Sequence, residues 1–288
     1  MSTSINPALA LRADFETVVS NIKAKFLEAP SIPSASWQST QAPQGMPEIH
    51  NHSFTLDLRG IVELSAYQEA FRPNLPWADD HFREDRVSGE PVNPGETWKK
   101  WPFARSADTH RREGGDDPQF DHSYAERYWP KFAGETPGGR FDRVQNEPHG
   151  PGHKGIRFYY GDLSDLVHLM GEDPLTRQGY LPVWFPEDLA AARDKKRVPC
   201  SLGYHFIQRD KKLHCYYPMR SCDFVRHFRD DVYLTVRLQL WLLSILKFKF
   251  PESWASVVPG TFTMHMVSLH LFDSDRVNIA QSIRQGVK

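Results

Sequence analysis

The sequence predicts an α+β fold, because helical and strand periodicities both occur along the chain. Apolar residues recur at helical spacing near the N-terminus and again in the second half, whereas other segments alternate between apolar and polar residues. The chain has 288 residues, of which 40% are hydrophobic and 12% aromatic. This is enough apolar material to bury a substantial core.

The first half begins with helix and strand signals and continues into an irregular segment. Residues 1–29 contain an amphipathic helix pattern that prolines end, and residues 31–47 are rich in Ser, Pro and Gln, as loops are. A strand is expected over 54–58 and a helix over 59–71. Residues 72–155 are rich in Pro, Gly, His and charge but also contain aromatic residues, so we expect a long, ordered and irregular insertion there.

Two segments of the second half have helical features. Leu163 to Met170 suits a helix that Gly171 ends. Residues 232–250 are long enough for a helix, but their apolar residues also fit a period of two. Periodicity therefore leaves helix and strand open for this segment.

A β-hairpin is expected over residues 202–219, where apolar residues alternate on both sides of a polar turn. Pairing in a hairpin is symmetric about its turn, so Cys200 should lie opposite Arg220 and Ser221. A nearby guanidinium favours the thiolate form of a cysteine, which makes Cys200 a candidate nucleophile. The alternative is that this cysteine is a small buried hydrophobic residue.

Charge and cysteine content argue against several classes of function. The formal net charge is -1, which gives no basic face for nucleic acid. The three cysteines cannot all pair, so at least one thiol is free, and a reducing, cytoplasmic location is expected. No apolar run approaches the roughly 20 residues of a membrane span, and no secretory signal is visible. The spacings of His, Cys and carboxylate residues predict no metal site.

Several motifs of the second half follow one another in a characteristic order. Cys200 follows a proline, and the sequence Arg-Ser-Cys-Asp stands after the hairpin at 220–223. Upstream, an Asp-Pro-Leu-Thr-Arg loop ends at Arg177, and downstream a His-Leu-Phe sequence stands at 270–272. This order resembles the active-site motifs of the thymidylate synthase superfamily, which includes the phage dCMP hydroxymethylases and the CMP hydroxymethylase of nucleoside-antibiotic biosynthesis. The resemblance extends over residues 162–272.

The resemblance implies a single domain over residues 1–288, with a large mixed β-sheet and flanking helices. It also implies a sheet-to-sheet homodimer, in which Arg177 reaches the phosphate site of the neighbouring subunit. Arg220 and Ser221 would hold the same 5′-phosphate, since a guanidinium forms bidentate bonds to phosphate oxygens. Further substrate contacts are implied for Asp223, His270 and Phe272.

The resemblance further implies the reaction. Cys200 would add to C6 of a pyrimidine nucleoside monophosphate, so that C5 attacks the methylene of the co-substrate 5,10-methylenetetrahydrofolate. The resulting C5 methylene is either reduced to methyl or captured by water as hydroxymethyl. Glu63 resembles the glutamate that manages protons at the base, although its spacing differs by one residue, and the alternative is a surface glutamate. Trp77 and Trp129 are candidates for stacking on the folate, with core packing as the alternative.

Departures from the family pattern indicate cytosine as the base. Asp231 stands eleven residues after Arg220, where the synthases have an asparagine that bonds uracil. A carboxyl group can accept a hydrogen bond from the cytosine amino group while it shares a proton with N3. Asp230 would take this role if the register slipped by one residue, and a solvated or capping aspartate is the alternative. Phe272 replaces a tyrosine of the sugar site, which is compatible with ribose.

The leading hypothesis is therefore 5-hydroxymethylation of CMP or dCMP by a one-carbon transferase. Only 16 residues follow Phe272, so less chain would cover the folate, in agreement with capture of the methylene by water. A synthase that methylates dUMP or UMP is the second hypothesis. A catalytically silent nucleotide-binding protein on the same fold is the third, because Gln178 replaces a phosphate-binding arginine and residues 34–44 contain none.

Overall fold

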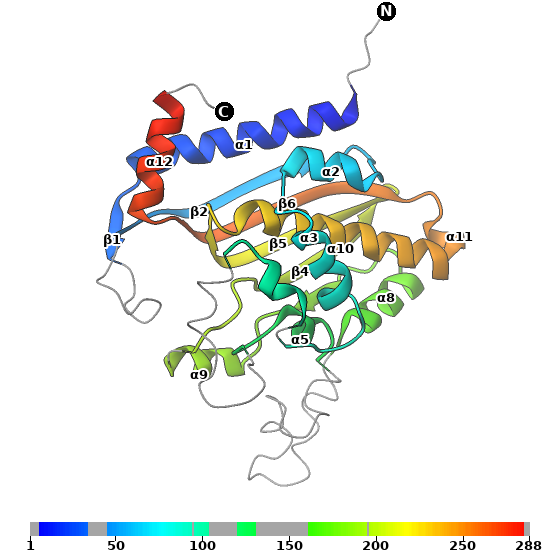
Figure 1. The fold of residues 1–288 in the computed structure, drawn as a ribbon. Coiled ribbons are helices and arrows are strands. Elements are labelled where there is room, and N and C mark those ends of the chain that lie inside the picture. Colours follow the sequence, from blue (N-terminus) through cyan, green and yellow to red (C-terminus); the bar gives the residue numbers. More distant parts are fainter. Residues whose placement is uncertain are drawn as a thin grey trace, which may run out of the picture.

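The computed structural model describes residues 6–33, 45–93, 95–103, 120–130, 161–194 and 196–284. Within these ranges the chain forms a six-stranded sheet in the order β1-β2-β6-β5-β4-β3 (Figure 1). β5 and β6 are parallel, and the other neighbouring strands are antiparallel. The strands are β1 (Ser31–Pro33), β2 (Gly45–Asp57), β3 (Tyr180–Pro182), β4 (Gly203–Arg209), β5 (Lys212–Asp223) and β6 (Val258–His270).

Helices flank this sheet, which confirms the predicted α+β class. The longest of the described helices are α1 (Pro7–Glu28) and α10 (Phe228–Lys249), and α1 confirms the helix expected within residues 1–29. None of the helices in the described ranges is both long and apolar enough to cross a membrane. The others are α2 (Leu64–Phe71), α3 (Trp77–Asp80), the π-helix η2 (His81–Arg86), the 3-10 helix η3 (Thr97–Lys100), α5 (Tyr124–Tyr128), α8 (Leu163–Glu172), α9 (Glu187–Arg193), α11 (Pro251–Trp254) and α12 (Asp273–Arg284).

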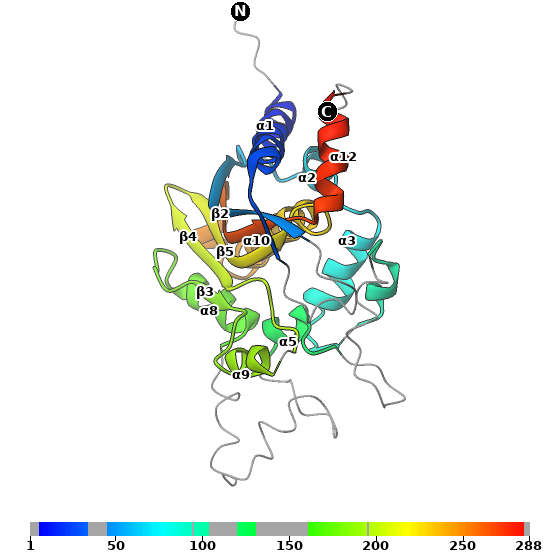
Figure 2. The same cartoon turned by 90° about the vertical axis from the view of Figure 1, so that its left-hand side faces the viewer.

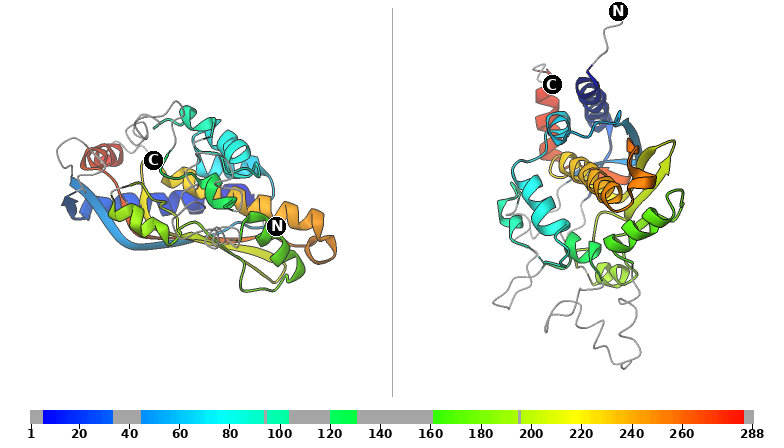
Figure 3. Two further views of the ribbon diagram at one scale, coloured as in Figure 1. Left: turned by 90° about the horizontal axis from the view of Figure 1, so that it is seen from below. Right: turned by 90° about the vertical axis from the view of Figure 1, so that its right-hand side faces the viewer.

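The two faces of the sheet have different surroundings. α10 packs on one face against β5 and β6, and α2 and α3 lie on the same side of the sheet (Figure 2). No described helix lies against the opposite face, as the left view of Figure 3 also shows. Cross-strand partners place a mixed polar and apolar set of side chains on that open face: Thr55, Tyr216, Pro218, Thr263 and His265.

α10 occupies the segment that periodicity left open between helix and strand. Buried residues follow one another without a polar face at its start, from Val232 to Val236. A helix that is apolar on all sides must be enclosed. The sheet covers one side of α10, and α2, α3 and α8 contact it from the others. The period of two among its apolar residues therefore does not indicate a strand.

Other boundaries differ from those that the sequence predicted. The helix expected over 59–71 begins at Leu64, because Arg59 and Gly60 have positive φ angles of 55° and 69° and form a turn after β2. The expected loop at 31–47 contains β1 and the first residues of β2.

The expected insertion over residues 72–155 is only partly described. Its described parts form short helices, namely α3, η2, η3 and α5, and not irregular chain throughout. Residues 104–119 and 131–155 of this segment lie outside the described ranges. The aromatic side chains that argued for an ordered segment are buried at Trp98 and Tyr128.

The hairpin of β4 and β5 agrees closely with its prediction. Arg209 pairs with Lys212, so only Asp210 and Lys211 form the turn. Both have positive φ, 52° and 57°, as a two-residue hairpin turn of type I′ requires. This tight turn fixes the register along the hairpin and so determines which residues of β5 lie beside Cys200.

Candidate active site

A pocket of about 190 Å³ opens where the C-terminal end of β5 meets the first turn of α10. The segment from α3 to α5 forms its other wall. Six of the residues that the sequence singled out line this pocket: Cys200, Ser221, Asp223, Asp230, Asp231 and Trp77. Residues far apart in the sequence therefore meet in one place.

Cys200 lies beside the two donors that hairpin symmetry predicted. Its carbonyl accepts a hydrogen bond from the backbone N–H of Arg220 at 2.9 Å. Its Sγ lies 3.6 Å from Oγ of Ser221 and 3.9 Å from Nη2 of Arg220. A hydroxyl donor and a guanidinium therefore lie beside the sulfur atom that would act as the nucleophile. Cys200 is also partly exposed, whereas Cys215 and Cys222 are buried.

Arg220 is held in place by the chain around Cys200. Its Nε donates to the carbonyl of Pro199 at 2.8 Å, and its Nη2 donates to that of Val198 at 3.1 Å. Nη1 donates to Ser221 Oγ at 3.2 Å. The two carbonyls orient the guanidinium, while Nη1 and the Ser221 hydroxyl lie together as donors for an anionic group.

Asp230 and Asp231 have different surroundings, although they are adjacent. The carboxylate of Asp230 accepts hydrogen bonds from the backbone N–H of Asn74 at 2.8 Å and from its Nδ2 at 2.7 Å. Asp231 has Cys222 Sγ at 3.8 Å from its Oδ2. Burial raises the pKa of Asp231 to about 7, although the positive charge of Arg86 opposes this rise. Asp231 thus has carboxyl oxygens available for a ligand, and Asp230 is engaged by Asn74.

The predicted sugar-site residues lie beside the pocket. Asp223 ends β5, pairs across the sheet with His270, and forms an ion pair with Arg226 at 3.1 Å. Burial lowers the pKa of His270, so this imidazole is neutral at pH 7. Phe272 packs under the guanidinium of Arg226, whose Cζ lies 4.6 Å from the ring centre. Of these predicted contacts, Asp223 lines the pocket, whereas His270 and Phe272 do not.

Three predicted residues lie away from the pocket. Glu63 is exposed at the start of α2, where its carboxylate accepts from the N–H of Val62 at 3.3 Å. Trp129 is buried in the core, and its Nε1 donates to the carbonyl of Arg86 at 3.0 Å. Arg177 is exposed after α8. The structure therefore does not bring Glu63 or Trp129 to Cys200, and it leaves Arg177 at the surface of the chain.

Several pocket residues were not predicted from the sequence. Trp98 and Trp101 line the pocket, as do His227 and Arg86. The ring of Trp101 stacks on His227 with centres 4.8 Å apart, and burial lowers the pKa of His227 to about 4. Trp98 and Trp101 could have been found from the Trp-x-x-Trp spacing, whereas nothing around Arg86 distinguishes it from other charged residues of its segment. The described residues contain no group of three or more His, Cys, Asp or Glu side chains that could hold a metal ion.

Comparisons with known proteins agree with this arrangement. No family model matches the sequence. A thymidylate synthase of Rhodopseudomonas palustris (strain BisA53) is 24% identical over 192 residues, which are 65% of this chain and 59% of that protein, so the chain matches less than two thirds of that relative.

Two solved structures have the same fold. The thymidylate synthase of T4 phage superposes with a TM-score of 0.56 at 13% identity, covering 93% of this chain and 80% of that one. Thermostable thymidylate synthase A of Bacillus subtilis gives a TM-score of 0.52 at 15% identity, covering 95% and 84%. The fold predicted from the sequence is confirmed, and the resemblance to the thymidylate synthase superfamily is supported.

Proposed function

We propose that this chain, which has the thymidylate synthase fold, is a one-carbon transferase that 5-hydroxymethylates a cytidine monophosphate, CMP or dCMP. The observation that carries the proposal is the position of Asp231. Its carboxyl group lines the same pocket as the Cys200 thiol, with a pKa raised to about 7 by burial.

The raised pKa of Asp231 suits cytosine. Near neutral pH, a carboxyl group with this pKa is protonated in a large fraction of molecules. The protonated form donates its O–H to N3 of cytosine, and its other oxygen accepts from the amino group at C4. Because the protonated form is lost as pH rises, kcat/KM for a cytidylate should fall as pH increases through about 7.

The remaining pocket residues have roles that follow from their positions. Arg220 and Ser221 would bind the 5′-phosphate through Nη1 and the hydroxyl, close to the thiol. The Cys200 thiolate would add to C6 of the base, which moves electron density to C5. C5 would then bond to the one-carbon unit of the donor, and loss of the C5 proton together with departure of tetrahydrofolate would leave an exocyclic methylene. Water would add to this methylene as the Cys200–C6 bond breaks, which releases the hydroxymethyl product.

The one-carbon donor would be 5,10-methylenetetrahydrofolate. When bound, it supplies a carbon at the oxidation level of formaldehyde. Trp77, Trp98 and Trp101 give the pocket an aromatic wall opposite α10, which fits a flat heterocycle. These three side chains are our candidates for holding the folate.

A methylating synthase is the second candidate. The three similar proteins named above favour this candidate, because each of them is a thymidylate synthase. Incubation of the protein with the folate and each of CMP, dCMP, UMP and dUMP separates the two. A 5-hydroxymethylcytidylate product supports our proposal, whereas a methylated uridylate with formation of dihydrofolate contradicts it. Nucleotide binding without any product would instead indicate a catalytically silent protein.

We also propose a homodimer formed through the open face of the sheet. This face has no described covering helix and presents Tyr216, which is 42% exposed, beside Thr263. Arg177 is exposed on the loop that precedes β3, the strand at the β4 edge of the sheet. In the described ranges, its guanidinium forms no hydrogen bond or ion pair that would hold it within its own chain, so it is free to reach a neighbouring phosphate site.

Subunit mixing tests this shared site. Cys200→Ser and Arg177→Ala homodimers should each be nearly inactive with cytidylate. After mixing and exchange, half of the dimers are mixed, and each of these contains one site with both residues intact. Activity should therefore recover to about a quarter of that of the unsubstituted protein. Mixing that restores no activity, although exchange is demonstrated with a tagged subunit, would contradict a shared site.

A further inference from the structure

Arg86 is a buried cation at the pocket. Its residue is 5% exposed, and its guanidinium carbon lies 4.2 Å from the centre of the Tyr124 ring. Nη1 donates to the hydroxyl of Tyr128 at 3.4 Å. Among the described residues, Arg86 forms no ion pair with a carboxylate. A charged group buried without an opposite charge in contact is costly, so its retention in the pocket calls for a function.

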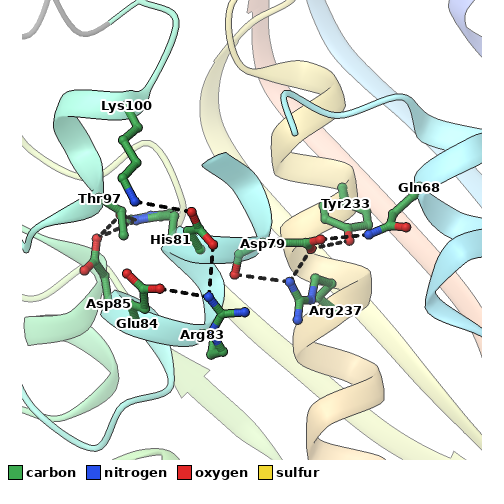
Figure 4. A network of polar contacts seen from close by, with 11 residues as sticks. Gln68, Asp79, His81, Arg83, Glu84, Asp85, Thr97, Lys100, Tyr233 and Arg237 are labelled. Carbon is green, nitrogen blue, oxygen red and sulfur yellow. Dashed lines mark hydrogen bonds and ion pairs between the residues drawn. The ribbon is translucent and has the colours of Figure 1, made fainter. Parts of the chain in front are cut away.

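A chain of polar contacts fixes the direction of this guanidinium. Arg86 donates from Nε to Nε2 of His81 at 3.0 Å. Nε2 of His81 must then be the acceptor nitrogen, so Nδ1 carries the proton and donates to Asp85 Oδ2 at 3.0 Å. Figure 4 shows His81 beside both Asp85 and Thr97. Burial lowers the pKa of His81, which agrees with a neutral imidazole between the carboxylate and the guanidinium.

A second set of contacts ties this segment to α10. Asp79, on α3 two residues before η2 begins, accepts a hydrogen bond from Tyr233 Oη at 2.6 Å and forms an ion pair with Arg237 (Figure 4). It also accepts from Gln68 Nε2 at 2.7 Å. Tyr233 and Arg237 belong to the same helix as Asp231. The position of Arg86 relative to Asp231 is therefore fixed by these contacts.

Asp231 is the complementary case, a partly buried acid at the pocket with no cation in contact among the described residues. In the described part of the chain it forms no ion pair, whereas Asp230 is bonded to Asn74 and Asp223 to Arg226. Arg86 is the cation whose charge acts on Asp231, and it opposes the effect of burial. The ionisable groups around Asp231 are Asp230 of α10, His227 directly before that helix, Cys222, Asp223 and Tyr217 of β5, and Tyr124, Cys200 and Arg86.

We propose that Arg86 is a specificity-determining residue that acts through Asp231, because its fixed charge stabilises the carboxylate and limits how readily Asp231 offers a proton to cytosine N3. The inference deepens the proposed function and rests on Asp231 as the group that binds the base. A cation at this place makes the choice of base depend on pH. At higher pH Asp231 becomes an acceptor only, which no longer complements N3 of cytosine.

The sign of the effect distinguishes this role from a structural one. Loss of a positive charge near a carboxyl group raises the pKa of that group. In Arg86→Gln, Asp231 should therefore stay protonated to higher pH, and the fall of kcat/KM for CMP should move up by about one pH unit. Arg86→Lys keeps a charge at this place and is the matched control, with a much smaller shift. An active Arg86→Gln protein whose profile falls at the same pH as that of the unsubstituted protein overturns the inference.

A direct titration of Asp231 makes the test independent of turnover. Infrared difference spectra give the carboxyl signal of Asp231, identified by its loss in Asp231→Asn. We expect a higher pKa in Arg86→Gln than in Arg86→Lys, and equal values overturn the inference. A raised pKa without any hydroxymethyl product would support the action of Arg86 on Asp231 and contradict the proposed function.

A further variant covers a failure of Arg86→Gln to fold, which circular dichroism would show. His81→Phe leaves the guanidinium charge in place but removes the acceptor that orients Nε. The Asp231 signal is then titrated in that variant. A raised pKa supports the positioning of Arg86 by His81, and an unchanged pKa overturns it.

Discussion

Cys200→Ser should abolish turnover while nucleotide binding survives. A hydroxyl is a far weaker nucleophile at neutral pH than a thiolate that has Arg220 Nη2 at 3.9 Å and Ser221 Oγ at 3.6 Å. Loss of a covalent nucleophile lowers kcat by about 10⁴-fold or more. Product formation and release of tritium from C5 should both disappear, whereas the dissociation constant for CMP, measured by calorimetry, should change by less than about tenfold, since serine is nearly isosteric.

Cys215→Ala is the matched control for this experiment. Cys215 is buried in the sheet, and burial alone raises its pKa far above the ordinary value, so it stays a neutral thiol. Its removal should lower the melting temperature through a small cavity and leave kcat unchanged. Retention of turnover in Cys200→Ser, with Cys215→Ala equally active, would show that the reaction needs no attack by this thiol.

Asp231→Asn should reverse the preference between cytidylate and uridylate. In the orientation that donates to O4 and accepts from N3–H, the asparagine amide complements uracil and is mismatched with cytosine, and in neither orientation can it transfer a proton to N3. A mismatch of buried hydrogen-bond groups costs about 10³-fold or more in kcat/KM. The ratio of kcat/KM for CMP over UMP should fall by at least that factor, and the decline of cytidylate turnover through pH 7 should disappear.

Asp230→Asn serves as the control for Asp231→Asn. Both oxygens of Asp230 accept hydrogen bonds from Asn74, so this variant should lose about 1 to 3 kcal/mol of stability through a mismatched contact. Its ratio of CMP to UMP turnover should stay the same. A change of base preference in Asp230→Asn and none in Asp231→Asn would show that the two roles are exchanged.

The sequence could predict those neighbours in the site that hairpin pairing brings together. Cys200 and Arg220 are brought together by hairpin pairing, and the polar turn at Asp210 and Lys211 is enough to set that register. The motif resemblance then identified Asp231. The neighbouring positions of Cys200 and Arg220 could be predicted because hydrogen bonding between adjacent strands connects residues at a distance that can be counted along the chain, whereas the role of Asp231 stays a prediction.

The rest of the pocket depends on packing between distant segments. Arg86 reaches the pocket because Asp79 ties its segment to α10 through Tyr233 and Arg237, contacts that no spacing along the chain reveals. The burial of the first part of α10 on all sides, from Val232 to Val236, removed the amphipathic pattern that would have identified this segment as a helix. Glu63 was placed near the base by resemblance, but the turn at Arg59 and Gly60 leaves it exposed at the start of α2.

The two adjacent aspartates at the start of α10 have different roles, one in holding a neighbouring segment and the other in the proposed contact with the base. Successive residues of an α-helix point in directions about 100° apart. Both aspartates line the pocket, but Asp230 is bonded to Asn74 and anchors the preceding segment, while Oδ2 of Asp231 lies 3.8 Å from Cys222 Sγ. In the proposed function the base contacts Asp231, whereas Asp230 holds the segment at Asn74. A substitution at Asp231 can therefore change which pyrimidine binds without detaching that segment from α10. The helix start is thus a position at which selection or protein engineering could change the substrate while the scaffold stays intact.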